Sequence, residues 1–355
     1  MFGFSDFSTL NLVTTYLLAI AGCSLNATAD DLKNFVAVTV EDAAQDPDFS
    51  IQGEYEGELE GEKGKQKWGL QVTTFGGNVT GGKFFSLLAY YGGLPGGDWD
   101  KNRVAPSQRV NIRTDKTFLL EGEIAVIGKY AKIVNGIATI KGSKGELLGE
   151  LKKVERASPT LNKKPPEGAI VLFDGKNADA FVEPRKFING RLSQGVTSKQ
   201  KFQDFSLHLE FLMPYVPFRR GDSNYGELDA NSGCYLQGRY ELQIFDSFGG
   251  GEGNKLGGGS IYNFAAPSVN MCFPPLQWQT YDLEYTAAKF DDDLKIQDAK
   301  ITVFHNGVLI HENVEIPQAS TVSPLQEGPE PGPIYLQDLG RGAPVYFRNI
   351  WLVEK

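Results

Sequence analysis

The sequence is poor in residues that bind metals or form disulfides. Its 355 residues include three cysteines and three histidines, without a CxxC, HExxH or HxH motif. These spacings are typical of zinc and redox sites, so no metal site is predicted. Cys234 and Cys272 lie outside the N-terminal segment. In an oxidising compartment they could pair, and the alternative is two separate buried thiols.

Positive charge is also scarce. The chain has 35 Lys and Arg against 44 Asp and Glu, which gives a formal net charge of -9 at pH 7. Proteins that bind nucleic acid need a basic face that displaces counterions from the phosphates. The charge therefore argues against nucleic acid as a partner and favours a neutral ligand.

Long segments with helical periodicity are nearly absent. The chain contains 41 glycines and 18 prolines, with 12% aromatic residues, and many of its apolar residues fall in short alternating runs. This pattern predicts an all-β protein with antiparallel sheets and little helix. A length of 355 residues predicts two domains.

The first 29 residues are predicted to be an export signal. Residues 10–22 are apolar but too short to span a bilayer. Residues 20–23 resemble the lipobox of bacterial lipoproteins, in which Cys23 would become the lipidated first residue, and cleavage after Ala29 is the alternative. Against both, no Lys or Arg precedes Leu10, and Asp6 is present. The expected location is periplasmic, or at a membrane through an anchor on Cys23.

A small β-rich domain is predicted at residues 30–156. Its alternating runs are separated by Gly, Asn or Asp turns, which indicates a small barrel or sandwich. Residues 157–167 are rich in proline and are predicted to be an extended linker. The strands expected before the linker are residues 51–57, 68–72, 84–88, 117–120, 124–127, 137–140 and 145–152.

Residues 168–355 are predicted to form a second β domain. In residues 205–211, apolar residues alternate with Ser, His and Glu, which marks a sheet with one buried and one polar face. Asn306 and Gly307 predict a tight hairpin turn, with His305 at the surface beside it. Two packed antiparallel sheets account for these strands.

The most informative stretch is residues 231–249, where two expected strands flank Gly238. In the second strand polar and apolar residues alternate, so its polar side chains are expected on one face. Asp246 joins Glu241 on this face only if a β-bulge lies near Phe245. The polar residues of this alternation are Arg239, Glu241 and Gln243, and the apolar ones are Tyr240, Leu242 and Ile244.

Two further patterns are weaker. Residues 249–259 are rich in glycine but lack the GK[ST] ending that reaches phosphate, so a mobile surface loop is expected rather than a nucleotide site. Asp291, Asp292 and Asp293 lack the spacing of a calcium loop and are expected to form a solvated turn.

Several blocks of the C-terminal half resemble the 3-keto-disaccharide hydrolase domain family. The most specific block is residues 231–249, and the blocks together cover about residues 168–355. The resemblance implies a concanavalin-like jelly-roll sandwich, related in fold to laminarinase-type glycoside hydrolases, with a saccharide on its concave sheet. The other blocks are residues 172–175, 205–211, 278–282, 305–308 and 347–351.

The resemblance implies an enzyme, a hydrolase or lyase, that cleaves 3-keto-glycosides such as 3-keto-disaccharides without a cofactor. The C3 carbonyl of such a sugar acidifies the C2 proton, so one base can drive elimination at C1 before water adds back. Glu241 is the expected base and Asp246 the acid or second base, with the cap of a turn as the alternative for Asp246. Gln243 and Arg239 are expected to donate toward the enolate oxygen. The other expected substrate-binding residues are Asn231, Tyr235, Gln237, His208, Glu210, Gln337 and Trp278, with Trp351 as a second stacking residue and burial in the core as the alternative for both tryptophans.

Two departures from related patterns keep a second function open. The family commonly has Leu-Gln-Asp-His-Gly where this chain has Leu339 in place of the histidine. Laminarinase-type enzymes carry Glu-x-Asp-x-x-Glu, whereas the same spacing here gives Glu241, Gln243 and Asp246, which argues against a strict double displacement. The alternative is a non-catalytic carbohydrate-binding protein with the same fold.

Overall fold

The computed structural model describes residues 35–76, 83–103, 106–111, 116–182, 187–217, 230–340 and 342–355. The predicted export signal and the lipidation site at Cys23 lie outside these residues. Within them the chain is almost entirely β, which confirms the predicted class. The described helices are α1 (Val40–Ala43) and the 3-10 helix η1 (Gly122–Ile127). In this part of the chain, no helix is long and apolar enough to cross a membrane.

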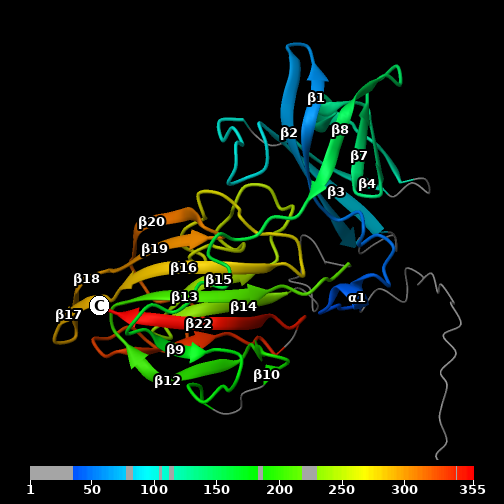
Figure 1. The fold of residues 1–355 in the computed structure, drawn as a ribbon. Helices are drawn as coiled ribbons and strands as arrows, with labels where there is room; N and C mark the ends of the chain where they lie inside the picture. Colours follow the sequence, from blue (N-terminus) through cyan, green and yellow to red (C-terminus); the bar gives the residue numbers. More distant parts are fainter. Residues whose placement is uncertain are drawn as a thin grey trace, which may run out of the picture.

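The N-terminal half folds into one curled antiparallel sheet, the upper lobe in Figure 1. Its strands are β1 (Gly53–Gly61), β2 (Gly64–Gly76), β3 (Lys83–Tyr91), β4 (Ser107–Asn111), β5 (Thr117–Leu119), β6 (Tyr130–Val134), β7 (Ile137–Lys141) and β8 (Leu147–Val154). The strand order is β4-β3-β2-β1-β8-β7-β6-β5. The edge strands approach each other, and the backbone N–H of Glu121 donates to Gln108 Oε1 of β4 at 2.8 Å. The curled sheet encloses a core that includes Tyr55, Phe85 and Phe118.

One predicted strand is wrong, because residues 124–127 belong to η1. Ile124 and Ile127 are three residues apart, so one 3-10 turn places both side chains on the same side of the segment. Both are buried in the N-terminal core. A strand would have sent these two side chains to opposite faces.

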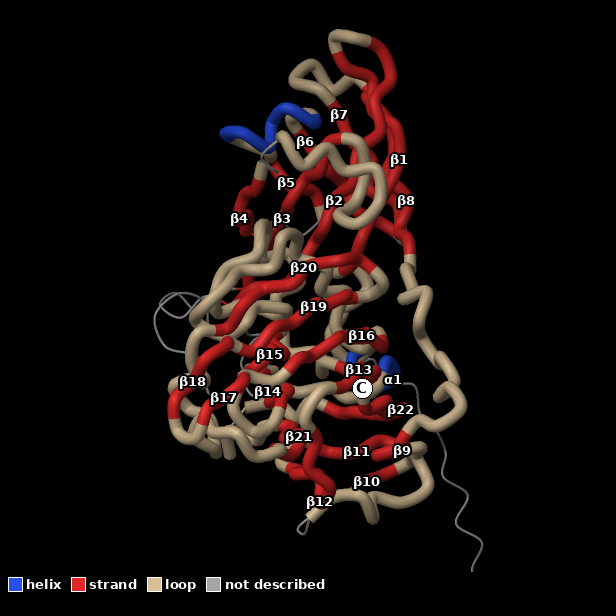
Figure 2. Tube along the Cα trace, turned by 90° about the vertical axis from the view of Figure 1, so that its left-hand side faces the viewer, coloured by secondary structure: helices blue, strands red, loops and turns tan. Residues whose placement is uncertain are grey.

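The C-terminal half folds as a jelly-roll sandwich of two antiparallel sheets (Figure 2). Its strands are β9 (Ile170–Phe173), β10 (Phe187–Ile188), β11 (Arg191–Ser193), β12 (Val196–Phe202), β13 (Phe205–Leu212), β14 (Asn231–Leu236), β15 (Tyr240–Phe245), β16 (Trp278–Thr286), β17 (Lys289–Asp291), β18 (Leu294–Gln297), β19 (Ala299–His305), β20 (Val308–Ile316), β21 (Gly332–Leu336) and β22 (Tyr346–Glu354). The larger sheet has the order β10-β11-β22-β13-β16-β19-β20, with β9 paired to β22, and the smaller sheet has the order β12-β21-β14-β15. β17 and β18 form a separate two-stranded sheet outside the sandwich sheets. Apolar side chains of both sheets, such as Leu209 and Leu242, fill the space between them. Cys234 and Cys272 are separate buried thiols, as in the second alternative above.

The predicted hairpin between β19 and β20 is confirmed. Asn306 and Gly307 have φ values of 50° and 78°, as a tight primed turn requires. The surface position predicted for His305 is wrong, since its exposed fraction is 1% and its Nε2 lies 3.0 Å from Gln279 Oε1. Burial lowers the pKa of His305 to about 3, so its imidazole is neutral.

The linker, residues 157–167, contains no strand and runs from β8 to β9 along one side of the sandwich (Figure 2). It lies against the outer face of the larger sheet. The smaller sheet is on the other side of the core, so the two outer faces of the sandwich are separate surfaces.

Candidate functional site

The register of the smaller sheet aligns tyrosines and a carboxylate on the face directed away from the core. Tyr235 of β14 pairs with Tyr335 of β21 on one side and with Glu241 of β15 on the other. An isolated antiparallel bridge between Leu242 of β15 and Ile261 brings Tyr262 beside Glu241. The backbone N–H of Tyr262 donates to the Glu241 carbonyl at 3.0 Å. Residues paired across antiparallel strands share a face. Tyr335, Tyr235, Glu241 and Tyr262 therefore form one row, here named the tyrosine row.

A second row lies two residues further along these strands, about 7 Å away. Gly233 of β14 pairs with Gln243 of β15. The backbone N–H of Gln337 donates to the Gly233 carbonyl at 2.9 Å, and that of Gln243 donates to the Ser260 carbonyl at 2.9 Å. These four residues, Gln337, Gly233, Gln243 and Ser260, are named the amide row.

Glu241 is the one carboxylate in these two rows. The Tyr235 hydroxyl donates to its Oε2 at 2.8 Å, and Gln337 Nε2 donates to that hydroxyl at 2.9 Å. The exposed fraction of Glu241 is 2%. Burial raises the pKa of this carboxyl group to about 7, while the hydrogen bond from Tyr235 opposes the rise. Glu241 is therefore poised to exchange a proton near neutral pH.

The second oxygen of Glu241 lies over Gly233. A Cβ atom at Gly233 would lie 2.4 Å from Oε1 of Glu241, so only glycine leaves room for the carboxylate. Within the described ranges, no group donates a hydrogen bond to Oε1. One oxygen is thus held by Tyr235, and the other keeps its lone pairs available for a proton.

Gln243 presents an acceptor to the same face. Its Nε2 donates to the Leu256 carbonyl at 3.4 Å. Its Oε1 and the Ser260 hydroxyl are both buried and have no hydrogen-bond partner among the described residues. Because a buried unpaired acceptor is costly, these atoms are suited to a ligand that brings donors, such as sugar hydroxyls. The structure favours this role for Gln243 over the predicted donation toward an enolate oxygen.

Asn231 and Asp246 lie at the same end of the β14–β15 ladder, away from the turn that joins the two strands. Asn231 pairs with Phe245 and shares the face of Glu241, and its Oδ1 is buried without a partner in the described part of the chain. The pairing is continuous over the whole ladder, so the bulge that would bring Asp246 beside Glu241 is absent from β15. Asp246 follows the strand, and its Oδ1 accepts from the backbone N–H of Phe248 at 3.2 Å. This contact is a turn cap.

Gln237 and Arg239 lie in the turn between β14 and β15, which corrects their predicted place in the site. Gln237 has a φ of 54°, and its Oε1 accepts from Tyr285 Oη at 2.9 Å and from Arg239 Nη1 at 3.0 Å. Arg239 also donates from Nε to the Gln326 carbonyl at 2.8 Å and from Nη1 to the Glu330 carbonyl at 2.9 Å. β15 begins only at Tyr240, after Arg239, and both side chains fasten the turn to the protein.

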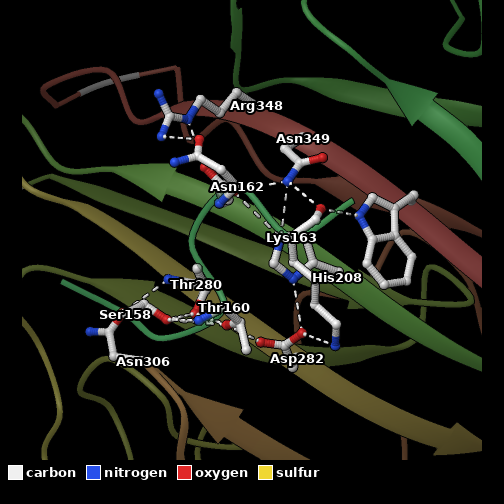
Figure 3. Close-up of polar contacts among 12 residues, drawn as sticks. Ser158, Thr160, Asn162, Lys163, His208, Thr280, Asp282, Asn306, Arg348 and Asn349 are labelled. Carbon is white, nitrogen blue, oxygen red and sulfur yellow. Dashed lines mark hydrogen bonds and ion pairs between the residues drawn. The ribbon is translucent and has the colours of Figure 1, made fainter. Parts of the chain in front are cut away.

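His208 and Glu210 lie on the outer face of the larger sheet, so the prediction that they bind substrate beside Glu241 is wrong. Figure 3 shows this region, in which His208 Nδ1 lies 2.9 Å from Asp282 Oδ1. Glu210 accepts from Arg348 Nε at 2.6 Å and from Asn349 Nδ2 at 2.9 Å. These five residues, His208, Glu210, Asp282, Arg348 and Asn349, are named the linker clamp.

The linker clamp binds the linker that crosses it (Figure 3). Thr160 Oγ1 donates to Asp282 Oδ2 at 2.5 Å, and the backbone N–H of Asn162 donates to Glu210 Oε1 at 2.5 Å. Burial alone would raise the pKa of Glu210, but hydrogen bonds from His208, Asn349, Arg348 and Asn162 lower it to about 2. The clamp is a charged contact that holds the linker on the sheet.

Both tryptophans considered for sugar stacking lie on this outer face as well. The Arg348 guanidinium lies 4.0 Å from the ring centroid of Trp278. Trp351 stacks on His208 with 5.1 Å between the ring centroids, and its Nε1 donates to the Lys163 carbonyl at 3.3 Å. Trp278 is therefore remote from Glu241, which corrects its predicted role.

Four residues of the two rows, Gly233, Tyr335, Tyr262 and Ser260, were not predicted as site residues from the sequence. Tyr335 alternates with Gln337 at a spacing of two, and this local pattern could have revealed it. Tyr262 and Ser260 reach β15 through a loop, for which the sequence has no local pattern. Among the residues that the structure describes, no group of three or more His, Cys, Asp and Glu side chains is placed to hold a metal ion.

These features define a class of protein, a jelly-roll sandwich with one buried carboxylate between tyrosines and amides on the outer face of its smaller sheet. The chain belongs to the 3-keto-alpha-glucoside-1,2-lyase-like domain family, whose model matches residues 168–353. The match spans the sandwich and both rows, so the C-terminal half is a glycoside hydrolase-like domain.

The solved structures that are similar to this chain include two that are described as candidate glycosyl hydrolases from Parabacteroides distasonis. The structure at 2.13 Å resolution has 28% identity and a TM-score of 0.48, covering 61% of this chain and 97% of its own. The structure at 2.00 Å resolution has 20% identity and a TM-score of 0.37, covering 53% of this chain and 99% of its own. No curated protein matches the chain. The family match is the basis of the identification.

Proposed function

We propose that this protein is a lyase that cleaves 3-keto-glycosides, with Glu241 as its catalytic base. The supporting observation is the state of this carboxylate, whose pKa is raised to about 7 and whose Oε1 is open over Gly233 while Tyr235 holds Oε2. A general base works best when its pKa lies near the operating pH. The C2 proton of a 3-keto sugar, acidified by the neighbouring carbonyl, is a suitable target for this base.

The reaction starts when Glu241 Oε1 takes the proton from C2. The electron pair of the C2–H bond forms a C2=C3 double bond, and the C3 oxygen becomes an enolate. The enolate then restores the C3 carbonyl, a C1=C2 double bond forms, and the bond from C1 to the leaving oxygen breaks. The leaving oxygen takes up one proton, which balances the proton lost from C2. The products are an unsaturated 3-keto sugar and a free alcohol, and later addition of water to the double bond completes a net hydrolysis.

Because the two rows contain a single carboxylate, Glu241, an elimination mechanism is favoured over the double displacement of retaining glycosidases. Retaining glycosidases use two carboxyl groups about 5–5.5 Å apart. Here Gln243 occupies the middle position of the spacing, and Asp246 lies beyond the end of β15. Burial and the Tyr235 hydrogen bond account for the pKa of Glu241, without a contribution from a second carboxylate of the described chain.

The two rows supply contacts for a carbohydrate. Tyr262 is half-buried next to Glu241, and Tyr335 is half-buried at the other end of the row beyond Tyr235. Their rings offer flat apolar surfaces beside polar hydroxyls. The unpaired acceptors of Gln243 and Asn231 suit the hydroxyl groups of the substrate. The proposed substrate is therefore a glycoside with hydroxyl groups close to the reacting ring.

The proposed location follows from the N-terminal sequence. Export to the periplasm, with an acyl anchor at Cys23 or cleavage after Ala29, would place the enzyme where glycosides enter the cell. The mass of the mature protein distinguishes the two alternatives, because only an anchor on Cys23 adds lipid to the first residue.

The direct experiment is release of product from a 3-keto disaccharide and from its unoxidised parent. Wild-type protein should cleave only the keto form, and Glu241→Gln should lose the activity because an amide cannot take the C2 proton. Glu284→Gln, which changes an exposed carboxylate paired with Lys355, is the matched control and should retain activity.

Two other outcomes would contradict the proposal. Equal turnover by Glu241→Gln and wild type would remove Glu241 as the base. Saturable binding of the keto sugar without cleavage would make this a carbohydrate-binding member of the family, and Leu339→His would then test whether the imidazole common in the family restores turnover.

A further inference from the structure

The loop that follows β15 returns to pair with the strand that carries the site. At its far end, the backbone N–H of Gly259 donates to the Gln243 carbonyl at 2.9 Å. The Gln243 N–H donates to Ser260, and the Tyr262 N–H donates to Glu241, as described above. The far end of residues 247–260, named the site loop, thus sets the edge of the amide row, and Tyr262, two residues beyond it, sets the edge of the tyrosine row.

The site loop is braced internally, so its two ends are coupled. Ser247 Oγ accepts from the backbone N–H of Gly258 at 2.6 Å. Asn270 Nδ2 donates to the Ser247 carbonyl at 2.8 Å and to the Gly251 carbonyl at 3.2 Å. A shift near Gly249 would therefore move Gly258 and the residues that pair with β15.

The near end of the site loop contacts the N-terminal domain. Gly249 has a φ of +69°, and a Cβ there would lie 2.7 Å from Thr73 Cγ2 of β2. A Cβ at Gly251 would lie 3.9 Å from Leu88 Cδ2 of β3. Thr73 is 2% exposed, and its hydroxyl lies 3.3 Å from Gln52 Oε1 within its own domain. Figure 1 shows β2 and β3 reaching from the upper lobe toward the sandwich.

Arg156, at the end of the N-terminal domain, is held by its own domain and also contacts the sandwich. The buried Glu54 of β1 accepts from Arg156 Nε at 2.7 Å and from Gln71 Nε2 at 3.0 Å. The Arg156 guanidinium also lies 4.9 Å from the ring centroid of Phe273 in the sandwich. Directly after Arg156 the chain enters the linker, which the linker clamp holds on the larger sheet (Figure 3). The N-terminal domain is therefore attached to the sandwich through Arg156 and through the linker that follows it.

We infer that the N-terminal domain helps to position the catalytic site, and that Thr73 is the positioning residue that holds the site loop against β15. Through Gly249, Ser247 and Gly258, the contact with Thr73 holds Ser260 and Tyr262 beside Gln243 and Glu241. It thereby keeps Glu241 buried. The effect on catalysis rests on the proposed function, whereas the effect on the loop does not.

The test places a methyl group into this contact. Gly249→Ala should clash with Thr73 Cγ2, and Gly251→Ala is the matched control, because its φ of +76° imposes similar backbone strain without a close contact. In hydrogen–deuterium exchange, peptides that cover residues 243–262 should lose protection in Gly249→Ala more than in Gly251→Ala. The turnover number for the keto-glycoside should fall on the order of tenfold. The midpoint of its pH profile should move below the value of about 7 set by burial of Glu241.

A second substitution at Thr73 separates this contact from a general loss of stability. Thr73→Ser removes Cγ2 and should partly restore protection and turnover in the Gly249→Ala background. Thr73→Val keeps the Cγ2 methyl group and replaces the hydroxyl by a second methyl group, so it should restore neither. Equal exchange in Gly249→Ala and Gly251→Ala, or equal rescue by serine and valine, would overturn the inference. If the wild type cleaves no keto-glycoside, the proposed function fails, while the exchange measurement still decides the role of Thr73.

Discussion

Tyr235 and Glu241 face each other across the β14–β15 ladder, and the Tyr235 hydroxyl donates a 2.8 Å hydrogen bond to Glu241 Oε2. This bond favours the charged carboxylate, whereas burial favours the protonated one. The balance leaves the pKa of Glu241 at about 7. The same hydroxyl accepts from Gln337, so its proton is directed toward the carboxylate.

Replacing Tyr235 by Phe should raise the pKa of Glu241 further. The change removes the interaction that opposes burial, so a larger fraction of Glu241 would be protonated at pH 7. The rising limb of the pH profile of kcat/KM should move to higher pH, with a greater loss of activity at pH 6 than at pH 8.5. Tyr335→Phe is the control, since Tyr335 lies in the same row without a hydrogen bond to Glu241. An unchanged midpoint in Tyr235→Phe would contradict this account.

Glu241→Gln should stabilise the protein at alkaline pH. The folded-state pKa of Glu241, about 7, exceeds its ordinary value of 4.5. A raised folded-state pKa contributes stability that is fully present below pH 4.5 and is lost as the pH rises through about 7. The ionised wild type then carries a cost of about 3 kcal/mol, which glutamine avoids.

Urea unfolding of both proteins at pH 5, 6.5 and 8 would measure this effect. The advantage of the variant should grow from pH 5 to pH 8. A difference that stays constant over this range would show that Glu241 does not ionise within a buried site.

The strand alternation in the sequence was sufficient to place Glu241 and Gln243 on one polar face, because that pattern is local. It could not place Arg239, since the turn with positive φ at Gln237 and Gly238 extends through Arg239 and β15 begins only at Tyr240. It also identified a polar face at His208 and Glu210 without indicating to which sheet that face belongs.

The remaining site residues depend on contacts between distant segments. Tyr262 joins Glu241 only because the site loop returns to β15, and Tyr335 arrives from β21. Such pairing is decided by the packing of the whole sandwich rather than by local preference. The covering of His208 by the linker is a long-range contact of the same kind.

Gly233→Ala should remove most of the activity. The new Cβ would lie 2.4 Å from Glu241 Oε1 and would push the carboxylate away from its position. Displacement of a base by about 1 Å can cost on the order of a hundredfold in rate. Overpacking of this kind should also lower the free energy of unfolding by about 1–3 kcal/mol.

A matched substitution separates the clash from a general effect of alanine. Gly328→Ala meets only Arg239 Nη2 at 3.7 Å, an ordinary contact, and should retain activity and stability. Kinetics and thermal unfolding of the two variants provide the comparison. Full activity in Gly233→Ala would mean that Glu241 does not act from its position over this glycine.

The linker clamp should loosen as the pH rises. Burial would lower the pKa of His208, but hydrogen bonds and attraction to Asp282 and Glu210 outweigh burial and raise it above 6.5. A raised folded-state pKa means that the stabilising charge is fully present below pH 6.5 and is lost as the pH rises through the folded value. His208→Gln lacks this charge at every pH, so its linker should be held equally weakly throughout.

Trypsin cleavage after Lys163, which lies in the linker above Trp351, gives a local measure of this contact. At each pH, the cleavage rate of His208→Gln is divided by that of the wild type, which cancels the pH dependence of trypsin itself. The ratio should be greatest near pH 6.5, where the wild-type imidazolium pairs with Asp282, and should fall toward one as that charge is lost. Both proteins should carry Glu241→Gln, so that the titration of the site carboxylate does not contribute. A ratio that is constant from pH 6.5 to pH 9 would show that the charge of His208 has no part in holding the linker, and that the neutral hydrogen bonds from Thr160 and Asn162 are sufficient.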